Sequence, residues 1–252
     1  MDNYIFITGA TSGFGEAIAR IFAKHNWNLI LTGRREERLE KLKNELQSSS
    51  NQIHTLCFDV RNELEVTQAI SSLPVEVKQN IRILINNAGL ALGRDSIENG
   101  VSSDWDQMID TNVKGLLYVS KAVIPLLIQA KTGHIVNISS IAGKEVYALG
   151  NVYCASKHAV DSLSKSMRIE LLPHNIKVTN IAPGAADTEF SLVRFKGNAE
   201  MADATYKGFE PLIAQDIADA VFFACTTPKH VCINDLVIMP TAQANATTFV
   251  KR

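Results

Sequence analysis

Several features that mark membrane, nucleic-acid-binding or secreted proteins are missing from this sequence. Its 252 residues carry a net charge of only −1, so no excess of one sign favours nucleic acid or an anionic membrane as a partner. No apolar run approaches the roughly 18 residues that a membrane-spanning helix needs. The start of the chain lacks a basic segment followed by a long apolar stretch, so we expect no signal peptide and a cytoplasmic location.

Cysteine is scarce, and the four present are Cys57, Cys154, Cys225 and Cys232. None of them forms a C-x-x-C pair, and no nearby histidines complete a zinc pattern. We therefore expect neither a disulfide framework nor a metal site, and we interpret the four cysteines as reduced thiols of a cytoplasmic protein.

What the sequence does contain is a regular alternation of strand-like and helical patterns. Strands are expected over residues 4–8, 28–32, 53–60, 82–86, 134–139, 177–182 and 235–239, and helices over 13–25, 35–48, 62–72, 104–131, 151–172 and 214–226. Several strands are almost continuously apolar, as is typical of strands buried on both faces. The alternation predicts an α/β fold, a Rossmann-type doubly wound sheet of about seven parallel strands with helices on both faces.

No linker or internal repeat divides the chain, and an α/β fold of this length is often a single domain. We therefore expect one domain over residues 1–252. Its least regular segment is 185–213, directly after Pro183-Gly184. Such a loop with short helices over one edge of a sheet often carries substrate contacts, so we predict a substrate-binding region there.

A glycine-rich turn follows the first expected strand. In TGATSGFG, residues 8–15, glycines stand at 9, 13 and 15, where the strand gives way to a helix. Glycine lets the backbone approach a diphosphate closely, and a helix N-terminus offers free N–H groups. The spacing G-x-x-x-G-x-G differs from the common dinucleotide fingerprint. A tight structural turn is the alternative, but the position in an alternating α/β chain favours a nucleotide site.

The end of the second strand indicates which nucleotide is bound. NAD-binding proteins commonly place an acidic residue there to hold the ribose hydroxyls. Here Gly33 occupies that position, and Arg34 and Arg35 follow it. Arginine pairs well with a 2′-phosphate, so we predict NADP as the cofactor. The alternative is a solvated helix start in which the following glutamates satisfy both arginines.

Further candidates lie at the ends of other strands, because ligands in open α/β sheets bind at the carboxyl ends. The predicted cofactor-binding set is Gly9, Thr11, Ser12, Gly13, Phe14, Gly15, Arg34, Arg35, Asp59, Val60, Asn86, Ala88, Gly89, Tyr153, Lys157, Pro183, Gly184 and Thr188. Tyr153 and Lys157 in NVYCASKHAV stand four residues apart, which places both on one face of a helix.

Taken together, TGATSGFG, NNAG (86–89), Asn112 in DTNVKG, NISSIAG (137–143), YCASK (153–157) and APG (182–184) occur in the order of the short-chain dehydrogenase/reductase family. The resemblance covers nearly the whole chain. Within the family, NNAGLALG, GNVYCASK and TEFSLVRFKG look like the NADP-dependent 3-hydroxy acid dehydrogenases. That subgroup oxidises L-allo-threonine and L-serine and reduces malonic semialdehyde to 3-hydroxypropionate, and its members are usually homotetramers.

The resemblance implies roles for four residues: Tyr153 as acid–base catalyst, Lys157 as its partner and ribose ligand, Ser140 beside the substrate oxygen, and Asn112 in a water-linked proton relay. A tyrosine has a pKa of about 10 in the absence of interactions. We expect Lys157 and the nicotinamide ring to lower the pKa of Tyr153, because nearby positive charge favours the phenolate.

For the substrate, the sequence offers Arg194 as a carboxylate ligand, with Tyr147 and Asn151 beside Ser140 and Tyr153 as further contacts. Two alternatives to a 3-hydroxy acid dehydrogenase stay open. One is an NADPH-dependent carbonyl reductase for bulkier ketones, and the other is a non-catalytic NADPH-binding regulator.

Overall fold

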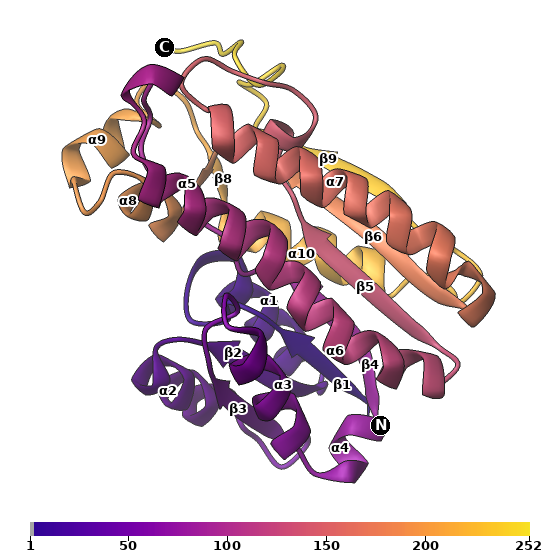
Figure 1. The fold of residues 1–252 in the computed structure, drawn as a ribbon. Coiled ribbons are helices and arrows are strands. Elements are labelled where there is room, and N and C mark those ends of the chain that lie inside the picture. The colour runs from indigo at the N-terminus through magenta and orange to yellow at the C-terminus, as the bar shows by residue number, and fades with distance from the viewer. Residues whose placement is uncertain (1–2) are drawn as a thin grey trace.

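The structure, a computed structural model, describes residues 3–252; residues 1 and 2 of the predicted domain lie outside the described range. Seven parallel strands form one sheet in the order β3-β2-β1-β4-β5-β6-β9 (Figure 1). They are β1 (Tyr4–Ile7), β2 (Asn28–Gly33), β3 (Ile53–Cys57), β4 (Ile81–Asn86), β5 (Gly133–Ile138), β6 (Ile176–Pro183) and β9 (Asp235–Ile238). The predicted Rossmann-type fold is confirmed.

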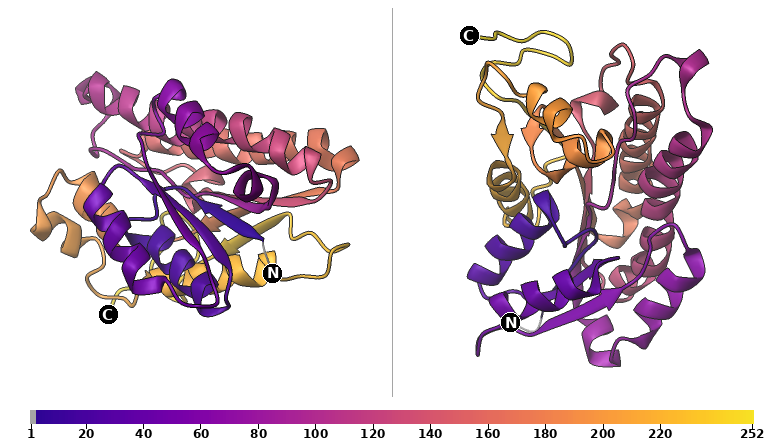
Figure 2. Two further views of the ribbon diagram at one scale, coloured as in Figure 1. Left: turned by 90° about the horizontal axis from the view of Figure 1, so that it is seen from below. Right: turned by 90° about the vertical axis from the view of Figure 1, so that its left-hand side faces the viewer.

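Helices cover both faces of this sheet, as the left view in Figure 2 shows. One face carries α1 (Gly13–Lys24), α2 (Glu36–Leu46) and α10 (Ala214–Cys225), and the other carries α3 (Glu63–Ser72), α6 (Leu116–Gln129) and α7 (Asn151–Leu171). The short helix α4 (Val75–Gln79), which lies just before β4, was not predicted. Its five residues are too few to give a clear helical periodicity.

The alternation of side chains along β1 explains why this strand is apolar throughout. Ile5 and Ile7 point into the core beneath α1 and α10, whereas Tyr4 and Phe6 point into the core beneath α3 and α6. A strand buried on both faces needs apolar residues at every position, and this pattern is typical of the middle of a doubly wound sheet.

The single helix predicted over 104–131 is interrupted in the structure. Helix α5 (Ser102–Ile109) leads into a π-helical segment, Asp110–Gly115, and then into α6. The run Ser102–Gln129 is long and apolar enough to cross a membrane by length and composition, but 44% of its most apolar 18-residue window is buried in this fold. A helix that covers a sheet needs the same apolar composition, and α6 packs against α3 and β4.

The segment predicted as a substrate-binding region folds into short elements. It contains β7 (Ala186–Asp187), α8 (Glu189–Arg194), α9 (Ala199–Ala204) and β8 (Leu212–Ile213), and β7 pairs with β8 in a separate two-stranded sheet. The Thr188 side chain accepts a hydrogen bond from the Phe190 N–H and so caps α8. This pairing and cap hold α8 beside the carboxyl ends of the main strands (Figure 1).

A histidine inside the sheet makes the stability of this fold depend on pH. His134 in β5 is 3% exposed, and its Nε2 lies 2.7 Å from the Thr179 hydroxyl. Burial, with a contribution from Lys177, lowers the pKa of His134 to about 3. The unfolded chain binds this proton near pH 6.5. Because the unfolded state binds more protons between these values, stability falls as the pH drops from about 6.5 towards 3.

We expect His134→Gln to remove this part of the pH dependence. In urea unfolding, the wild type should lose about 2 kcal/mol more than His134→Gln between pH 7 and pH 5, at 1.36 kcal/mol per pH unit below the unfolded-state pKa. His230→Gln at an exposed position is the matched control. Equal losses in the wild type and His134→Gln would contradict the prediction.

Candidate active site

A cavity of about 1110 Å³ opens at the carboxyl ends of the central strands. The loops after β1 and β4 border it, and the order of the strands reverses between these two neighbours. Cofactor and substrate sites in open α/β sheets lie at this kind of switch point. Small-molecule sites commonly measure about 300–1,000 Å³, so this cavity has room for a dinucleotide and a small substrate.

The glycine-rich turn forms one wall of the cavity. Gly9 and Gly13 have φ angles of +66° and +54°, in the region that glycine adopts without strain. Gly15 does not line the cavity; a Cβ on it would lie 2.3 Å from the Gly9 carbonyl oxygen, so its role is close packing of α1 on the turn. Thr11, Ser12 and Phe14 line the cavity, as predicted.

One predicted cofactor residue, Asn86, lies elsewhere. Its side chain is buried and donates hydrogen bonds to Ser120 and Asn137 on the α6 side of the sheet. The next residue, Asn87, lines the cavity and donates to the carbonyl oxygens of Thr8 and Gly9 at 2.9 and 3.1 Å. Successive side chains in a strand point to opposite faces, so the assignment of Asn86 is wrong by one residue. Ala88 and Gly89, which were also predicted to bind the cofactor, line the cavity.

Two arginines follow β2 at the far end of the cavity. Arg35 donates to the hydroxyls of Thr11 and Ser12 at 2.8 Å, which ties the start of α2 to the glycine turn. Ser12 precedes α1 but does not cap it with its side chain. Arg35 and Arg38 also both pair with Glu189 of α8. Through Glu189, the segment 185–213 is therefore fixed against Arg35 and Arg38.

Arg34 is less constrained than Arg35. Its side chain is 56% exposed, and its ion pair with Asp59 spans 3.6 Å. Asp59 is more tightly paired with Arg61; burial raises the pKa of Asp59, but the Arg61 hydrogen bonds and charge outweigh it, so the net pKa is lowered. Arg34, Asp59 and Val60 all line the cavity. Gly33 carries no side chain there, and a Cβ on it would meet Thr11 at 2.8 Å.

These features fit a phosphorylated dinucleotide. The cavity wall lacks side chains at Gly9, Gly13 and Gly33, so a ligand can approach the backbone closely. Two guanidinium groups stand at the end of β2, and no carboxylate replaces them. The residues present therefore suit NADP.

Tyr153 and Lys157 face the cavity from one side of α7. Tyr153 is 7% exposed and Lys157 is 6% exposed, and the Lys157 Nζ lies 6.0 Å from the centre of the Tyr153 ring. Lys157 donates a 2.9 Å hydrogen bond to the Ile138 carbonyl oxygen. Ser140, which follows β5, lines the same cavity; its hydroxyl accepts from the Ala142 N–H and donates to the Pro183 carbonyl oxygen. The structure thus brings Tyr153, Lys157 and Ser140 together as the sequence predicts.

We expected a lowered pKa for Tyr153, but the interactions that the protein itself provides raise it. Burial is the largest influence and raises the pKa of Tyr153 well above its usual value, and neighbouring Tyr147 adds to this. The Ser140 hydroxyl and the Arg194 charge act in the opposite direction but are weaker. Burial also lowers the pKa of the Lys157 ammonium to about 8. The sequence could not show that both groups are withdrawn from water.

Asn112 lies in the π-helical segment and is 2% exposed. Its side chain exchanges two 2.8 Å hydrogen bonds with the backbone of Leu90 and donates to the Ser156 hydroxyl at 2.9 Å. Single π-helical turns inside α-helices often occur at functional sites. Here Asn112 joins the end of β4 to α7 and does not itself line the cavity.

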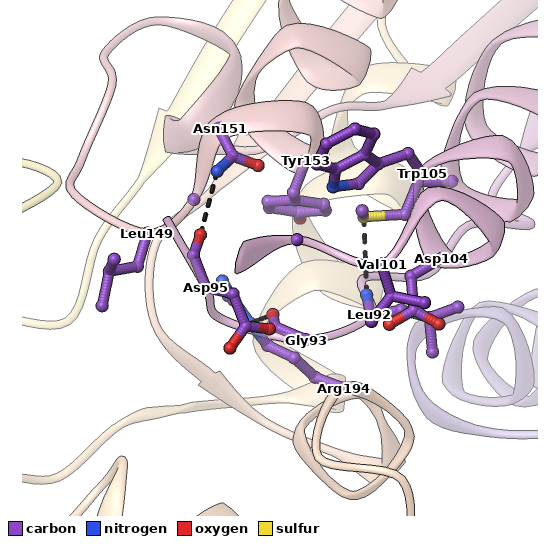
Figure 3. A pocket seen from close by; sticks show the side chains of 13 residues that line it. Leu92, Gly93, Asp95, Val101, Asp104, Trp105, Leu149, Asn151, Tyr153 and Arg194 are labelled. Carbon is purple, nitrogen blue, oxygen red and sulfur yellow. Dashed lines mark hydrogen bonds between the residues drawn. The ribbon is translucent and has the colours of Figure 1, made fainter. Parts of the chain in front are cut away.

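Arg194 reaches from α8 to the end of the cavity that holds Tyr153. Its guanidinium donates to the Tyr147 hydroxyl at 3.0 Å and to the Gly93 carbonyl oxygen at 3.3 Å. Its Cζ lies 5.6 Å from the centre of the Tyr153 ring. Figure 3 shows Tyr153 and Arg194 together on a smaller neighbouring cavity. Arg194 and Tyr147, two of the residues predicted to contact the substrate, are therefore hydrogen-bonded to each other, and Arg194 lies beside Tyr153.

Asn151 points away from the large cavity. Its Nδ2 donates to the Asp95 carbonyl oxygen at 2.9 Å, as the dashed line in Figure 3 shows, and its Oδ1 accepts from the Val152 N–H. Asn151 thus holds the loop after β4, and it lines the smaller cavity together with Tyr153 and Arg194. The reason is geometric, because Asn151 stands at the first turn of α7 and faces that loop.

Other residues at the site were not predicted. Phe190 packs against Tyr153 with ring centres 5.5 Å apart, and Arg94 lines the cavity from the loop after β4. The C-terminal segment contributes Gln243, Thr247 and Phe249. Phe190 lies in the stretch TEFSLVRFKG, so the sequence could have indicated Phe190 as a site residue. In contrast, no pattern in the C-terminal sequence shows that this segment folds back over the cavity.

Comparisons with known proteins agree with this geometry. The family described as short chain dehydrogenase matches residues 3–198. The chain is 49% identical over 245 residues to a sulfoacetaldehyde reductase of Chromohalobacter salexigens, covering 97% of this chain and 96% of that protein. It is 45% identical over 249 residues to the NADP-dependent 3-hydroxy acid dehydrogenase YdfG of Escherichia coli (strain K12), covering 98% and 99%. A solved structure of the closed form of serine dehydrogenase complexed with NADP+ is 45% identical, covers 99% of each chain and superimposes with a TM-score of 0.92.

Proposed function

Because this chain belongs to the short-chain dehydrogenase family, we propose that it oxidises small 3-hydroxy acids such as L-allo-threonine, L-serine or 3-hydroxypropionate, or reduces the corresponding carbonyl compounds. It is an NADP-dependent oxidoreductase of small hydroxy acid or aldehyde substrates. The observation that carries the finer proposal is the position of Arg194. A guanidinium lies beside Tyr153 at the same end of the cavity, so a substrate with an acid group would present its hydroxyl to the tyrosine.

The cofactor would extend from the arginines at the end of β2 to Tyr153. Arg34 and Arg35 would hold the 2′-phosphate, and the turn from Gly9 to Gly15 would receive the diphosphate. Further contacts would come from Asp59, Val60, Ala88, Gly89, Pro183, Gly184, Thr188 and Lys157, all of which line the cavity. When bound, NADP+ supplies the hydride acceptor and a positive ring that favours the Tyr153 phenolate.

Tyr153 exchanges the proton of the substrate oxygen. In oxidation its phenolate accepts the hydroxyl proton, and in reduction its hydroxyl returns a proton to the carbonyl oxygen. Ser140, which lines the cavity together with Tyr153, donates to the same substrate oxygen as charge develops there. Lys157 supplies positive charge near the phenol, and Asn112 fixes α7 against the end of β4 so that this spacing is kept.

Arg194 and Tyr147 orient the acid group of the substrate. A guanidinium matches a carboxylate with two parallel hydrogen bonds, and Tyr147 already accepts one hydrogen bond from Arg194. A second candidate function is the reduction of sulfoacetaldehyde, which the 47% and 49% identity to two sulfoacetaldehyde reductases favours. Bulkier neutral ketones fit less well, because they give the guanidinium no anionic partner.

A rate measurement with a panel of substrates tests the proposal. Initial rates with NADP should be highest for small hydroxy acids and much lower for neutral secondary alcohols of similar size. A preference for a bulky apolar alcohol would overturn the proposal in favour of a general carbonyl reductase. The same family resemblance leads us to propose one domain over 1–252, a homotetramer and a cytoplasmic location, which sedimentation and cell fractionation would test.

Arg34 offers a test of the phosphate site. We expect Arg34→Gln to raise KM for NADP about 10-fold and to leave KM for NAD unchanged, because only NADP has a 2′-phosphate, and a hydrogen bond between charged groups contributes about 1.5–3 kcal/mol. Lys41→Gln is the matched control, since Lys41 is an exposed cation on α2 that does not line the cavity. An equal effect of Arg34→Gln on both coenzymes would place Arg34 away from the phosphate.

A further inference from the structure

One cation on the cavity wall has no partner in the described chain. Arg94 lies in the loop after β4 and lines the large cavity. Among residues 3–252 no carboxylate or carbonyl oxygen pairs with its guanidinium. The other arginines of the cavity are all engaged: Arg34 with Asp59, Arg35 with Glu189, and Arg194 with Tyr147.

The backbone on both sides of Arg94 is held in place. Gly93 has a φ of +67°, donates its N–H to the Arg194 carbonyl oxygen at 3.0 Å, and accepts from the Arg194 Nε. On the other side, the Asp95 carbonyl oxygen accepts from Asn151, as Figure 3 shows. Arg94 therefore projects from a fixed point, and α8 and α7 hold that point beside the reacting end of the cavity.

The charges of Arg194 and Arg94 both influence the Tyr147 hydroxyl. Burial raises the pKa of the Tyr147 hydroxyl, and the positive charges of Arg194 and, more weakly, Arg94 act to lower it. Glu189, a carboxylate that lines the large cavity, is already paired with Arg35 and Arg38. The positive charges of Arg194 and Arg94 therefore both reach the Tyr147 hydroxyl.

We propose that Arg94 is a second ligand for the acid group of the substrate, in addition to Arg194, and that this pair favours a sulfonate over a carboxylate. The inference rests on the proposed function. One guanidinium in a two-pronged pair uses both oxygens of a carboxylate. A sulfonate has a third oxygen, which can accept from a second guanidinium approaching from the other side. Arg94 is accordingly a specificity-determining residue.

Three alcohols that differ mainly in the acid group test this assignment: 2-hydroxyethanesulfonate, 3-hydroxypropionate and neutral 3-hydroxypropionamide. With NADP, Arg94→Gln should lower kcat/KM for the sulfonate about 10- to 30-fold, mainly through KM, and for the carboxylate about threefold or less, because hydrogen bonds between charged groups are the stronger ones. The amide should be unaffected. Arg94→Lys should restore part of the loss for the sulfonate. Lys229→Gln, an exposed cation away from the cavity, is the control.

Binding of the unreactive anions ethanesulfonate and propionate, measured by calorimetry in the presence of NADP, gives a readout that does not require turnover. The Kd ratio of propionate to ethanesulfonate should fall in Arg94→Gln. An unchanged ratio, or an equal loss for all three alcohols, would overturn the role of Arg94. A wild type that binds both anions but oxidises neither alcohol would instead overturn the proposed function, and the Kd ratio would still decide the role of Arg94.

Discussion

Replacing Tyr153 by phenylalanine should lower kcat about 10³- to 10⁴-fold, the upper part of the range for loss of a general acid–base group. The phenylalanine ring fills the same buried site, so the fold and the packing against Phe190 should persist. What is lost is the oxygen that exchanges a proton with the substrate. Because Ser140 keeps its bonds to Ala142 and Pro183, no buried hydroxyl is left without a partner.

Initial rates together with NADP binding by fluorescence titration check this result. The Kd for NADP should change little, since phenylalanine retains the shape of the cavity wall. Tyr147→Phe is the matched control: it removes a neighbouring hydroxyl that accepts from Arg194, and it should raise KM for the substrate more than it lowers kcat. A Tyr153→Phe variant with a kcat near that of the wild type would show that turnover does not pass through Tyr153.

Arg194→Ala should raise KM for small hydroxy acids about 30- to 100-fold and leave KM for NADP nearly unchanged, as expected for the loss of hydrogen bonds between charged groups. The guanidinium lies within 5.6 Å of the Tyr153 ring centre and is the cation that faces the acid group in the proposed function. Its removal also frees the Gly93 carbonyl oxygen, which loosens the loop after β4.

Steady-state kinetics with a charged and a neutral alcohol separate these two effects. Loss of the charge contact should raise KM only for the anionic substrate, whereas loosening of the loop would affect both. Lys207→Ala, an exposed cation in the same segment, is the control and should match the wild type. Unchanged KM for the hydroxy acid in Arg194→Ala would remove Arg194 from the substrate site.

Most of the sheet could be predicted because its signals are local. Each strand of the main sheet overlaps a predicted apolar run, and α1, α2, α3, α7 and α10 begin within two residues of the prediction. The errors lie where a tertiary contact decides the outcome. The helix predicted over 104–131 contains a π-helical segment, and the Asn112 side chain in that segment bonds to the backbone of Leu90, far away in sequence.

The sequence by itself determined the parts of this site that depend only on residues close together along the chain. The glycine turn requires positive φ at Gly9 and Gly13, and the four-residue spacing of Tyr153 and Lys157 places both on one face of α7. Only the tertiary structure decided which asparagine reaches the turn and how burial shifts the pKa values of Tyr153 and Lys157. It also decided that Arg194 of α8 contacts Gly93 in the loop after β4. These outcomes depend on burial and on contacts between segments about 100 residues apart, which local patterns do not encode.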